Sequence, residues 1–410
     1  MDHKINIKLL SKKGVSNNIV FDIKGDSTIG LDKSIINALR RTILSGIPTI
    51  GFRTDIDQSD IKIVKNNTSL HNEFLLHRFA LLPLYIDPID YNKQYLFYLN
   101  VENIDQPIKT ITAGDINIYP LKKNIDPDLL KEIDINNYDT ENPINDKQKN
   151  NILRPFRFKN KNEYCILTEL KNTNSKIKQS LELYGVPRVS YAHEDARWQS
   201  VSCATYSFKK NDELFKKVLK EKSEIEEIKD KKDFEKALFI KDSERYFYRD
   251  IQAEPFWYTF KIDSQHHYSS KEIFITACEI ITKDLEIFSK ELPKIISDED
   301  CIMSLNKDKN NENIYEISVQ NYDNTIGNLL QNYISRYLIN NKSVLNLCGY
   351  KKEHPLEQSI SFKLSINPNN KIFNQSIEQK LVAMIQIIQE ACADLINIFA
   401  KINAEADSKL

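Results

Sequence analysis

The sequence is poor in glycine and tryptophan and carries almost no net charge. Its 410 residues include only 9 glycines and 2 tryptophans, and 57 basic residues nearly balance 58 acidic ones. A protein whose main task is to coat nucleic acid carries a clear positive excess. The net charge of −1 therefore argues against that class, although local basic patches remain compatible with it.

Motifs of common enzyme centres are also absent. The sequence contains no glycine-rich phosphate loop, no G-x-S-x-G nucleophile motif and no H-E-x-x-H zinc motif. One group of carboxylates, Asp55, Asp57 and Asp60, could hold Mg²⁺, but a surface turn explains it more simply. We therefore expect no catalytic, cofactor-binding or metal-binding residue in this chain.

The six cysteines are scattered, and no two of them form a C-x-x-C pair. This spacing predicts reduced thiols in an intracellular protein and argues against a disulfide framework or a zinc ribbon. No apolar run reaches the about 18 residues that a membrane-spanning helix needs. The first residues also lack the apolar core of a signal peptide, so we expect no membrane contact.

Two parts of the chain share one plan, in which strands precede a short amphipathic helix and a long helix follows. The short helices are expected at about 31–45 and 325–338, each near a Thr-Ile-Gly triplet, at 28–30 and 325–327. The long helices are expected at 271–292 and 376–404, each with an apolar stripe. Two units that each expose such a stripe would pair within the chain as a pseudo-dimer.

Between and around these units lie polar, turn-rich stretches. We expect residues 124–151 to form a mobile loop and residues 293–312 to form a linker. The Lys/Glu-rich stretch 209–236 predicts a solvated helix with pairs of opposite charge at i,i+4, and a docking face is the alternative.

Two polar motifs interrupt apolar helices. In residues 37–41 (NALRR), Asn37 and Arg41 belong to a narrow polar stripe, and Arg40 lies roughly 100° further round the helix. These arginines could bind carboxylates or carbonyls of another chain, or simply be exposed. In residues 67–84, Thr68 or Ser69 could cap a helix that carries Arg78, which is alternatively a satisfied polar group at the helix edge.

These two motifs, read together, resemble the alpha-like assembly subunit of DNA-directed RNA polymerases. That family includes the N-terminal domain of the bacterial alpha subunit and the third-largest subunit of polymerase II. Its opening helix carries N-A-L-R-R, and its inserted domain begins with N-T-S…E…H-R. Where the chain returns to the first domain, the family carries H-x-x-x-x-W-x-x-V, here residues 193–201.

The last hundred residues resemble the partner of that subunit, the eleventh subunit of polymerase II. The family signature D-H-T-L-G-N-L-L corresponds to residues 323–330, with Asn324 in place of the usual histidine. The G-Y…H-P-L-E turn corresponds to residues 349–357. The five motifs occur in the family's order over most of the chain.

The resemblance implies an α+β fold in which two alpha-type dimerisation domains pair as an intramolecular pseudo-dimer. The first would comprise 1–55 and 200–292, a mainly-β domain would be inserted at 56–199, and the second would comprise 313–410. The two long helices are expected to pack against the two short ones. Many cellular third subunits carry a four-cysteine zinc loop in the inserted domain, whereas this one contains only Cys165, so no zinc or iron–sulfur site is expected there.

The implied function is assembly, without catalysis by this chain. The largest and second-largest polymerase subunits would dock on the pseudo-dimer, small polymerase subunits would join them, and nucleic-acid contact would be slight. Mg²⁺ and Zn²⁺ are expected in other subunits, and no homo-oligomer is needed. The expected subunit-interface residues come from both halves and from the inserted domain: Asn37, Arg40, Arg41, Thr68, Ser69, Arg78, Gly327, Asn328, Gly349, Tyr350, His354 and Pro355.

Such fusions are a feature of some large cytoplasmic DNA viruses. This implies a location in the host cytoplasm, at the virus factory, and packaging in the virion. Three other classes compete with the assembly function: a stand-alone homodimeric scaffold, a nucleic-acid-binding protein with the same fold, and a metal-dependent hydrolase around Asp57.

Overall fold

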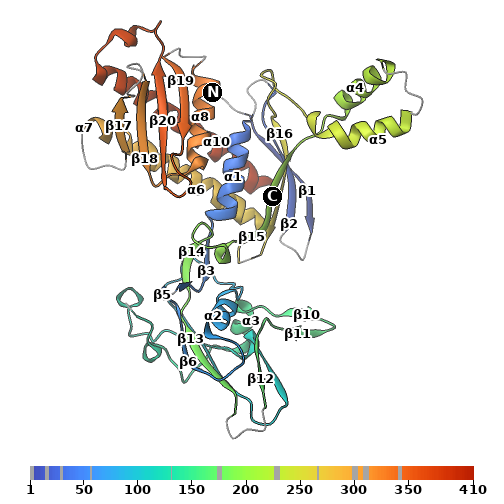
Figure 1. Cartoon of the computed structure of the whole chain (residues 1–410), viewed down its shortest axis with the longest axis vertical. Coiled ribbons are helices and arrows are strands. Elements are labelled where there is room, and N and C mark those ends of the chain that lie inside the picture. Colours follow the sequence, from blue (N-terminus) through green and yellow to red (C-terminus); the bar gives the residue numbers. More distant parts are fainter. Residues whose placement is uncertain are drawn as a thin grey trace. The chain divides into compact units, whose positions relative to one another are not determined.

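The computed structural model divides into two compact units (Figure 1). Unit 1 comprises the chain up to Leu44, Cys203–Ser264 and Ser270–Leu410, and unit 2 comprises Ser45–Ser202 and Gln265–Ser269. The structure describes all residues except these: 1–3, 14–17, 28–30, 56–57, 131, 173–177, 226–230, 266, 298–302, 308–313 and 340–343. The first Thr-Ile-Gly triplet, Asp57 and Cys301 lie outside the described residues.

The first half of unit 1 is an antiparallel sheet covered by a short and a long helix. The strand order is β1 (Asn6–Lys13), β2 (Asn18–Lys24), β16 (Trp257–Ser264), β15 (Val201–Phe208). Helix α1 spans Lys33–Ser45 and helix α6 spans Ser270–Glu291. Phe274 of α6 meets Phe21 of β2 edge-on, with ring centroids 5.1 Å apart, so α6 packs on its own sheet.

The second half of unit 1 has the same order of elements. Its strand order is β17 (Met303–Lys307), β18 (Ile314–Gln320), β20 (Ser359–Ile366), β19 (Leu345–Lys351). Helix α8 (Asn324–Tyr333) occupies the place of α1, and α10 (Ile377–Lys409) that of α6. In both halves a hairpin precedes the short helix, and two further strands and the long helix follow it. The repeat seen in the sequence thus extends to the sheet topology.

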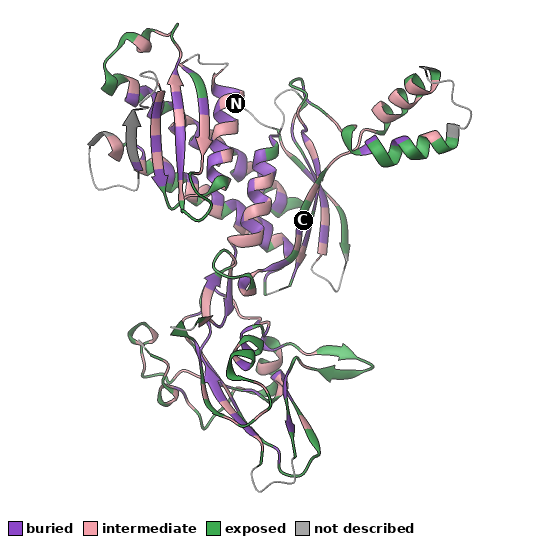
Figure 2. Cartoon of the chain, viewed as in Figure 1, coloured by how far each residue is buried: buried purple, intermediate pink, exposed green. Residues whose placement is uncertain are grey.

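The two long helices pack along each other in opposite directions (Figure 1). Lys271, at the start of α6, donates to the carbonyl of Asp407 near the end of α10 at 2.6 Å. Gln389 of α10 donates to the carbonyl of Ser289 near the end of α6 at 3.2 Å. Their facing stripes are buried (Figure 2) because apolar residues recur every three or four positions.

By length and composition alone, α10 could also cross a membrane, and it is the one such helix among the described residues. Half of its apolar window is buried inside the fold. The search for uninterrupted apolar runs, on which the sequence argument relied, does not detect this helix because polar residues lie in sequence between the apolar residues of its stripe.

Unit 2 is built mainly from strands. Its largest sheet has the order β6 (Ile61–Asn66), β13 (Ser180–Gly185), β7 (Tyr95–Glu102), β9 (Asn117–Pro120). Four two-stranded sheets accompany it, formed by these pairs: β3 (Pro48–Gly51) with β14 (Arg188–Tyr191), β4 (Thr54–Asp55) with β5 (Gln58–Ser59), β8 (Ile108–Thr112) with β12 (Ile166–Lys171), and β10 (Phe156–Phe158) with β11 (Lys161–Glu163). Helices α2 (Asn72–Ala80) and α3 (Asp146–Ile152) complete it.

Three polar stretches have more structure than the sequence predicts. Residues 124–151, expected as a mobile loop, contain two 3₁₀ turns and most of α3. Tyr138 within them is 2% exposed, and its hydroxyl donates to the carbonyl of Lys93 at 3.0 Å. Tyr138 belongs to a small apolar cluster with Leu96 and Tyr119 of the sheet, a contact that the polar composition of the segment does not reveal.

The other two stretches also contain regular elements. The Lys/Glu-rich stretch forms two helices instead of one, α4 (Asp212–Ile225) and α5 (Lys231–Asp242), which project from the sheet of the first half (Figure 1). The predicted linker 293–312 contains α7 (Lys294–Ser297) and the edge strand β17. The proposed domain boundaries stay a prediction.

Candidate assembly surfaces

The polar stripe of α1 contacts the second half of unit 1. Arg41 donates from Nε to Thr325 Oγ1 at 2.9 Å and from a terminal nitrogen to Asp323 Oδ2 at 2.7 Å. Asp323 is the N-cap of α8, because its Oδ1 accepts from the backbone N–H of Thr325 at 2.8 Å. The sequence predicted Arg41 as a contact to another chain. In the structure it connects the two short helices of this chain, and its contact to another chain stays a prediction.

The contact with Arg41 changes the pKa of Asp323. Burial raises the pKa of its carboxyl, but the hydrogen bonds from Arg41 and Thr325 lower it by more, so the pKa lies below its usual value. Both members of the pair are partly accessible, with Arg41 at 40% and Asp323 at 50% side-chain exposure. An ion pair this exposed contributes little to stability.

A second arginine also connects the halves, but here the second half supplies the arginine and the first half supplies the aspartates. Arg336 lies in a π-helical turn, Ile334–Leu338, that continues α8. It donates to Asp32 Oδ2, just before α1, at 3.1 Å, and it also pairs with Asp250. Each short helix therefore offers an arginine to an aspartate of the other half. The sequence analysis did not single out Arg336, although a lone arginine in an apolar helix end was a visible signal.

The other predicted residues of α1 and α8 have local roles. Asn37 Oδ1 accepts from Arg40 Nε at 3.0 Å, so it orients that arginine along α1. Asn328 Oδ1 accepts from Asn332 at 2.9 Å. Gly327 is buried, and a Cβ there would lie 2.5 Å from the ring of Tyr350. Glycine is thus required at this position for the close approach of β19.

The turn that follows β19 is exposed. Gly349 lies in the strand, and a Cβ there would meet nothing within 4 Å. His354 and Pro355 are exposed, and His354 Nδ1 accepts from the N–H of Leu356 at 3.2 Å. Leu356 is 86% exposed, which makes it the most prominent apolar side chain of the turn.

In unit 2 the predicted residues surround α2. The helix begins at Asn72, and its N-cap is His71, whose side chain accepts from the N–H of Glu73 at 3.5 Å. The prediction that Thr68 or Ser69 caps this helix is therefore wrong. Thr68 instead closes a turn one step earlier, where its hydroxyl accepts from the N–H of Leu70 at 3.2 Å, and Ser69 is exposed.

Two exposed apolar residues of α2 were missed by the sequence analysis. Phe74 is 65% exposed, and Leu81, at the end of the helix, is 52% exposed. Their i,i+7 spacing places them on one face, together with Arg78, which reaches the carbonyl of Leu167 at 3.1 Å. We call Phe74, Arg78 and Leu81 the α2 face. Phenylalanine and arginine are both enriched at protein interfaces, and Leu81 adds exposed apolar area.

Two of the three aspartates considered for a metal site, Asp55 and Asp60, pair with arginines. Asp60 is buried and accepts from Arg188 Nε at 2.8 Å and from the backbone N–H of Arg53 at 2.8 Å. Asp55 pairs with the Arg53 side chain. Within the described part of the chain, no three His, Cys, Asp or Glu side chains are arranged to hold a metal ion.

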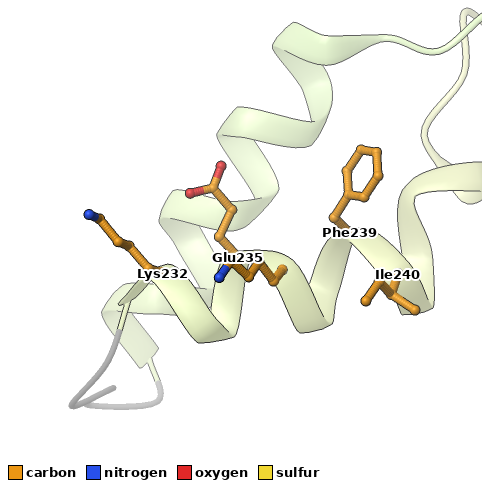
Figure 3. A pocket seen from close by; sticks show the side chains of 5 residues that line it. Lys232, Glu235, Phe239 and Ile240 are labelled. Atoms are coloured by element: carbon orange, nitrogen blue, oxygen red, sulfur yellow. The ribbon is translucent and has the colours of Figure 1, made fainter.

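A hollow of about 450 Å³ lies beside α5 (Figure 3). It is lined by Lys232, Glu235, Lys236, Phe239 and Ile240. The lining includes no pair of nucleophile and base, so the hollow does not suggest a catalytic centre.

Comparison with known proteins identifies the fold. A model of the RNA polymerase Rpb3/Rpb11 dimerisation domain matches residues 27–285, and a second model with the same description matches residues 315–405. The chain belongs to the Rpb3/Rpb11 dimerisation-domain family. It is an alpha-like RNA polymerase subunit with an α+β fold and two such domains in tandem.

Individual members of the family align over shorter stretches. The chain is 32% identical over 127 residues to DNA-directed RNA polymerases I and III subunit rpac1 of Dictyostelium discoideum. It is 36% identical over 86 residues to DNA-directed RNA polymerase subunit Rpo3 of Pyrococcus furiosus, and 30% identical over 98 residues to Rpo3 of Methanocaldococcus jannaschii. These alignments cover 31%, 21% and 24% of this chain and 30%, 28% and 45% of the relatives. Subunits of this type are non-catalytic parts of the polymerase.

Proposed function

We propose that this chain is the assembly platform of a multisubunit DNA-directed RNA polymerase. Its two Rpb3/Rpb11-type domains would pair with each other as an intramolecular pseudo-dimer, with the mainly-β unit 2 inserted in the first. The two large catalytic subunits would dock on this pair, and nucleotidyl transfer would be carried out by them. Because the two domains share one chain, their pairing would not depend on protein concentration.

The packing of α6 against α10 is the observation that carries this proposal. These helices come from the two family-matched domains, and they pack along each other within unit 1. Phe288 of α6 also meets Phe362 of β20, with ring centroids 6.0 Å apart, so the long helix of one domain contacts the sheet of the other. Two domains that cover each other's apolar faces leave their outer surfaces for partners.

The α2 face is the part of unit 2 that best supports docking. Phe74 and Leu81 are exposed apolar anchors, and Arg78 lies between them. The predicted contacts Thr68 and Ser69 lie just before the same helix. We expect this face to meet the second-largest polymerase subunit, as the resemblance implies for this segment.

The experiment is purification of the tagged full chain from its native source, with identification of the proteins that accompany it. The expected result is one copy each of the two large polymerase subunits. Phe74→Ser should abolish their capture, whereas Ile104→Ser, which changes another exposed apolar residue of unit 2, should not. Recovery of the chain alone would refute the proposal.

The competing functions have less support. A nucleic-acid-binding protein would show affinity for DNA that falls steeply with salt. A metal-dependent hydrolase would need free carboxylates, and Asp55 and Asp60 are held by arginines. A location in a virus factory or a virion, and the absence of a bound metal, stay predictions.

A further inference from the structure

Arg336 is the most deeply embedded arginine contact between the two halves of unit 1. Only 9% of its side chain is exposed. Nε donates to Gln252 at 2.6 Å, one terminal nitrogen donates to Asp32 at 3.1 Å, and the other pairs with Asp250. All three nitrogens of one guanidinium are thus bound by residues of the first half.

Hydrogen bonds within the first half orient both aspartates toward Arg336. Asp32 accepts from the N–H of Ser34 at 2.6 Å through Oδ1, which leaves Oδ2 for Arg336. Asp250 accepts through Oδ1 from the N–H groups of Gln252 and Glu254, at 2.9 and 3.1 Å, and also presents Oδ2. Their side chains are 7% and 0% exposed. Two buried carboxylates aimed at one point repel each other unless a cation lies between them.

The first half has no arginine at the matching place. Each short helix is preceded by a capping aspartate, Asp32 for α1 and Asp323 for α8. Thirteen positions after Asp323 comes Arg336, whereas thirteen positions after Asp32 comes Ser45. A second copy of the first half, docked in the same way, would place Ser45 at the position of Arg336, and its Arg41 would face Asp32 as Arg41 faces Asp323 here.

We propose that Arg336 is the residue that fixes the pairing of the two halves, and that Asp32 and Asp250 together form its binding site. The first half accepts the second half in this arrangement because Arg336 supplies the cation that its two buried carboxylates need. The π-helical turn serves this contact, since it sets the direction of Arg336 at the end of α8. This inference rests on the intramolecular pairing proposed above.

The test uses the isolated full chain and hydrogen exchange followed by mass spectrometry. In Arg336→Met, peptides of α1 and α8 should exchange about 100- to 1,000-fold faster, because removing one partner leaves buried charges without compensation. Strands β7 and β13 of unit 2 serve as the internal reference and should not change. Arg336→Glu should increase exchange in α1 and α8 further, since three carboxylates would then lie close together.

Two control variants separate charge compensation from packing. The triple variant Asp32→Asn, Asp250→Asn, Arg336→Met keeps the local acceptors of Ser34 and Gln252 but removes all three charges, so protection should return to within about tenfold of wild type. Arg41→Met, at the exposed contact, should change exchange less than about fivefold.

An unchanged exchange rate in Arg336→Met would overturn the inference. A triple variant that exchanges as fast as Arg336→Met would also overturn it. The measurement needs no polymerase. A chain that captures the large subunits but shows no effect at Arg336 would refute this inference and leave the proposed function intact.

Discussion

The two arginine contacts between the halves of unit 1 differ in burial and in charge balance. Arg336 is almost enclosed and faces two carboxylates, whereas Arg41 is partly accessible and faces one. A buried charge is costly to leave without a partner, and an exposed one is not. The comparison therefore separates two proposed roles: Arg336 holds the halves together, and Arg41, whose side chain is 40% exposed, is accessible to another chain.

An apolar contact between the two halves should show the largest effect. Phe288 is fully buried and meets Tyr322 and Phe362 of the second half, with ring centroids 5.2 and 6.0 Å away. Phe288→Ala should cost about 3–5 kcal/mol and increase hydrogen exchange in both halves, because it removes a contact between them.

Phe274 is the matched control on the same helix. It is equally buried but meets Phe21 and Phe260 of its own half. Phe274→Ala should therefore increase exchange mainly in the first half. Equal effects of the two substitutions on the second half would contradict the pairing through α6.

Substitution of Gly327 should have an intermediate effect on stability, and Gly349 provides the control. Gly327→Ala places a methyl group 2.5 Å from the Tyr350 ring and should cost about 1–2 kcal/mol, after the gain in helix propensity is allowed for. Gly349→Ala meets open space and should change stability by less than about 0.5 kcal/mol. Chemical denaturation measures both, and equal costs would show that the close approach of α8 and β19 is not required.

The exposed Arg41–Asp323 pair should show the smallest effect on stability. Because the pKa of Asp323 is lowered in the fold, its contribution is present at neutral pH and is lost as the pH falls through that lowered value. Arg41→Ala should cost less than about 1 kcal/mol at neutral pH. The difference from wild type should disappear at pH values below this lowered pKa, where the carboxyl is protonated.

Assembly should respond to Arg41→Ala more strongly than stability does. We expect the variant to stay folded yet to lose the large polymerase subunits on purification. A fully active polymerase of unchanged composition, containing this variant, would remove Arg41 from the docking surface.

Helices were predictable from the sequence where apolar residues follow the helical period throughout. Helix α1 was expected at about 31–45 and is Lys33–Ser45, and the last helix was expected from about 376 and begins at Ile377. Both carry an uninterrupted apolar stripe, which is the strongest local signal. Helix α3 and the edge strand β17 were missed because both lie in polar stretches without an apolar period. The cap of α2 is a local contact, and it was missed because histidine is not among the usual N-cap residues.

The candidate surfaces were predictable only in part. The N-A-L-R-R motif directed attention to Arg41, but its partner Asp323 is 282 residues away in the chain. Asp32 lies 304 residues from Arg336, so no local pattern connects them. Exposure of Phe74 and Leu81 likewise depends on which side of α2 the core occupies.

The number of copies of this chain in one polymerase tests the central claim most directly. Tagged and untagged copies would be produced together, and the complex purified through the tag. If the two halves pair within one chain, the purified polymerase should contain only the tagged copy. Recovery of the untagged copy in the same complex would mean that two chains pair with each other, and it would contradict the account.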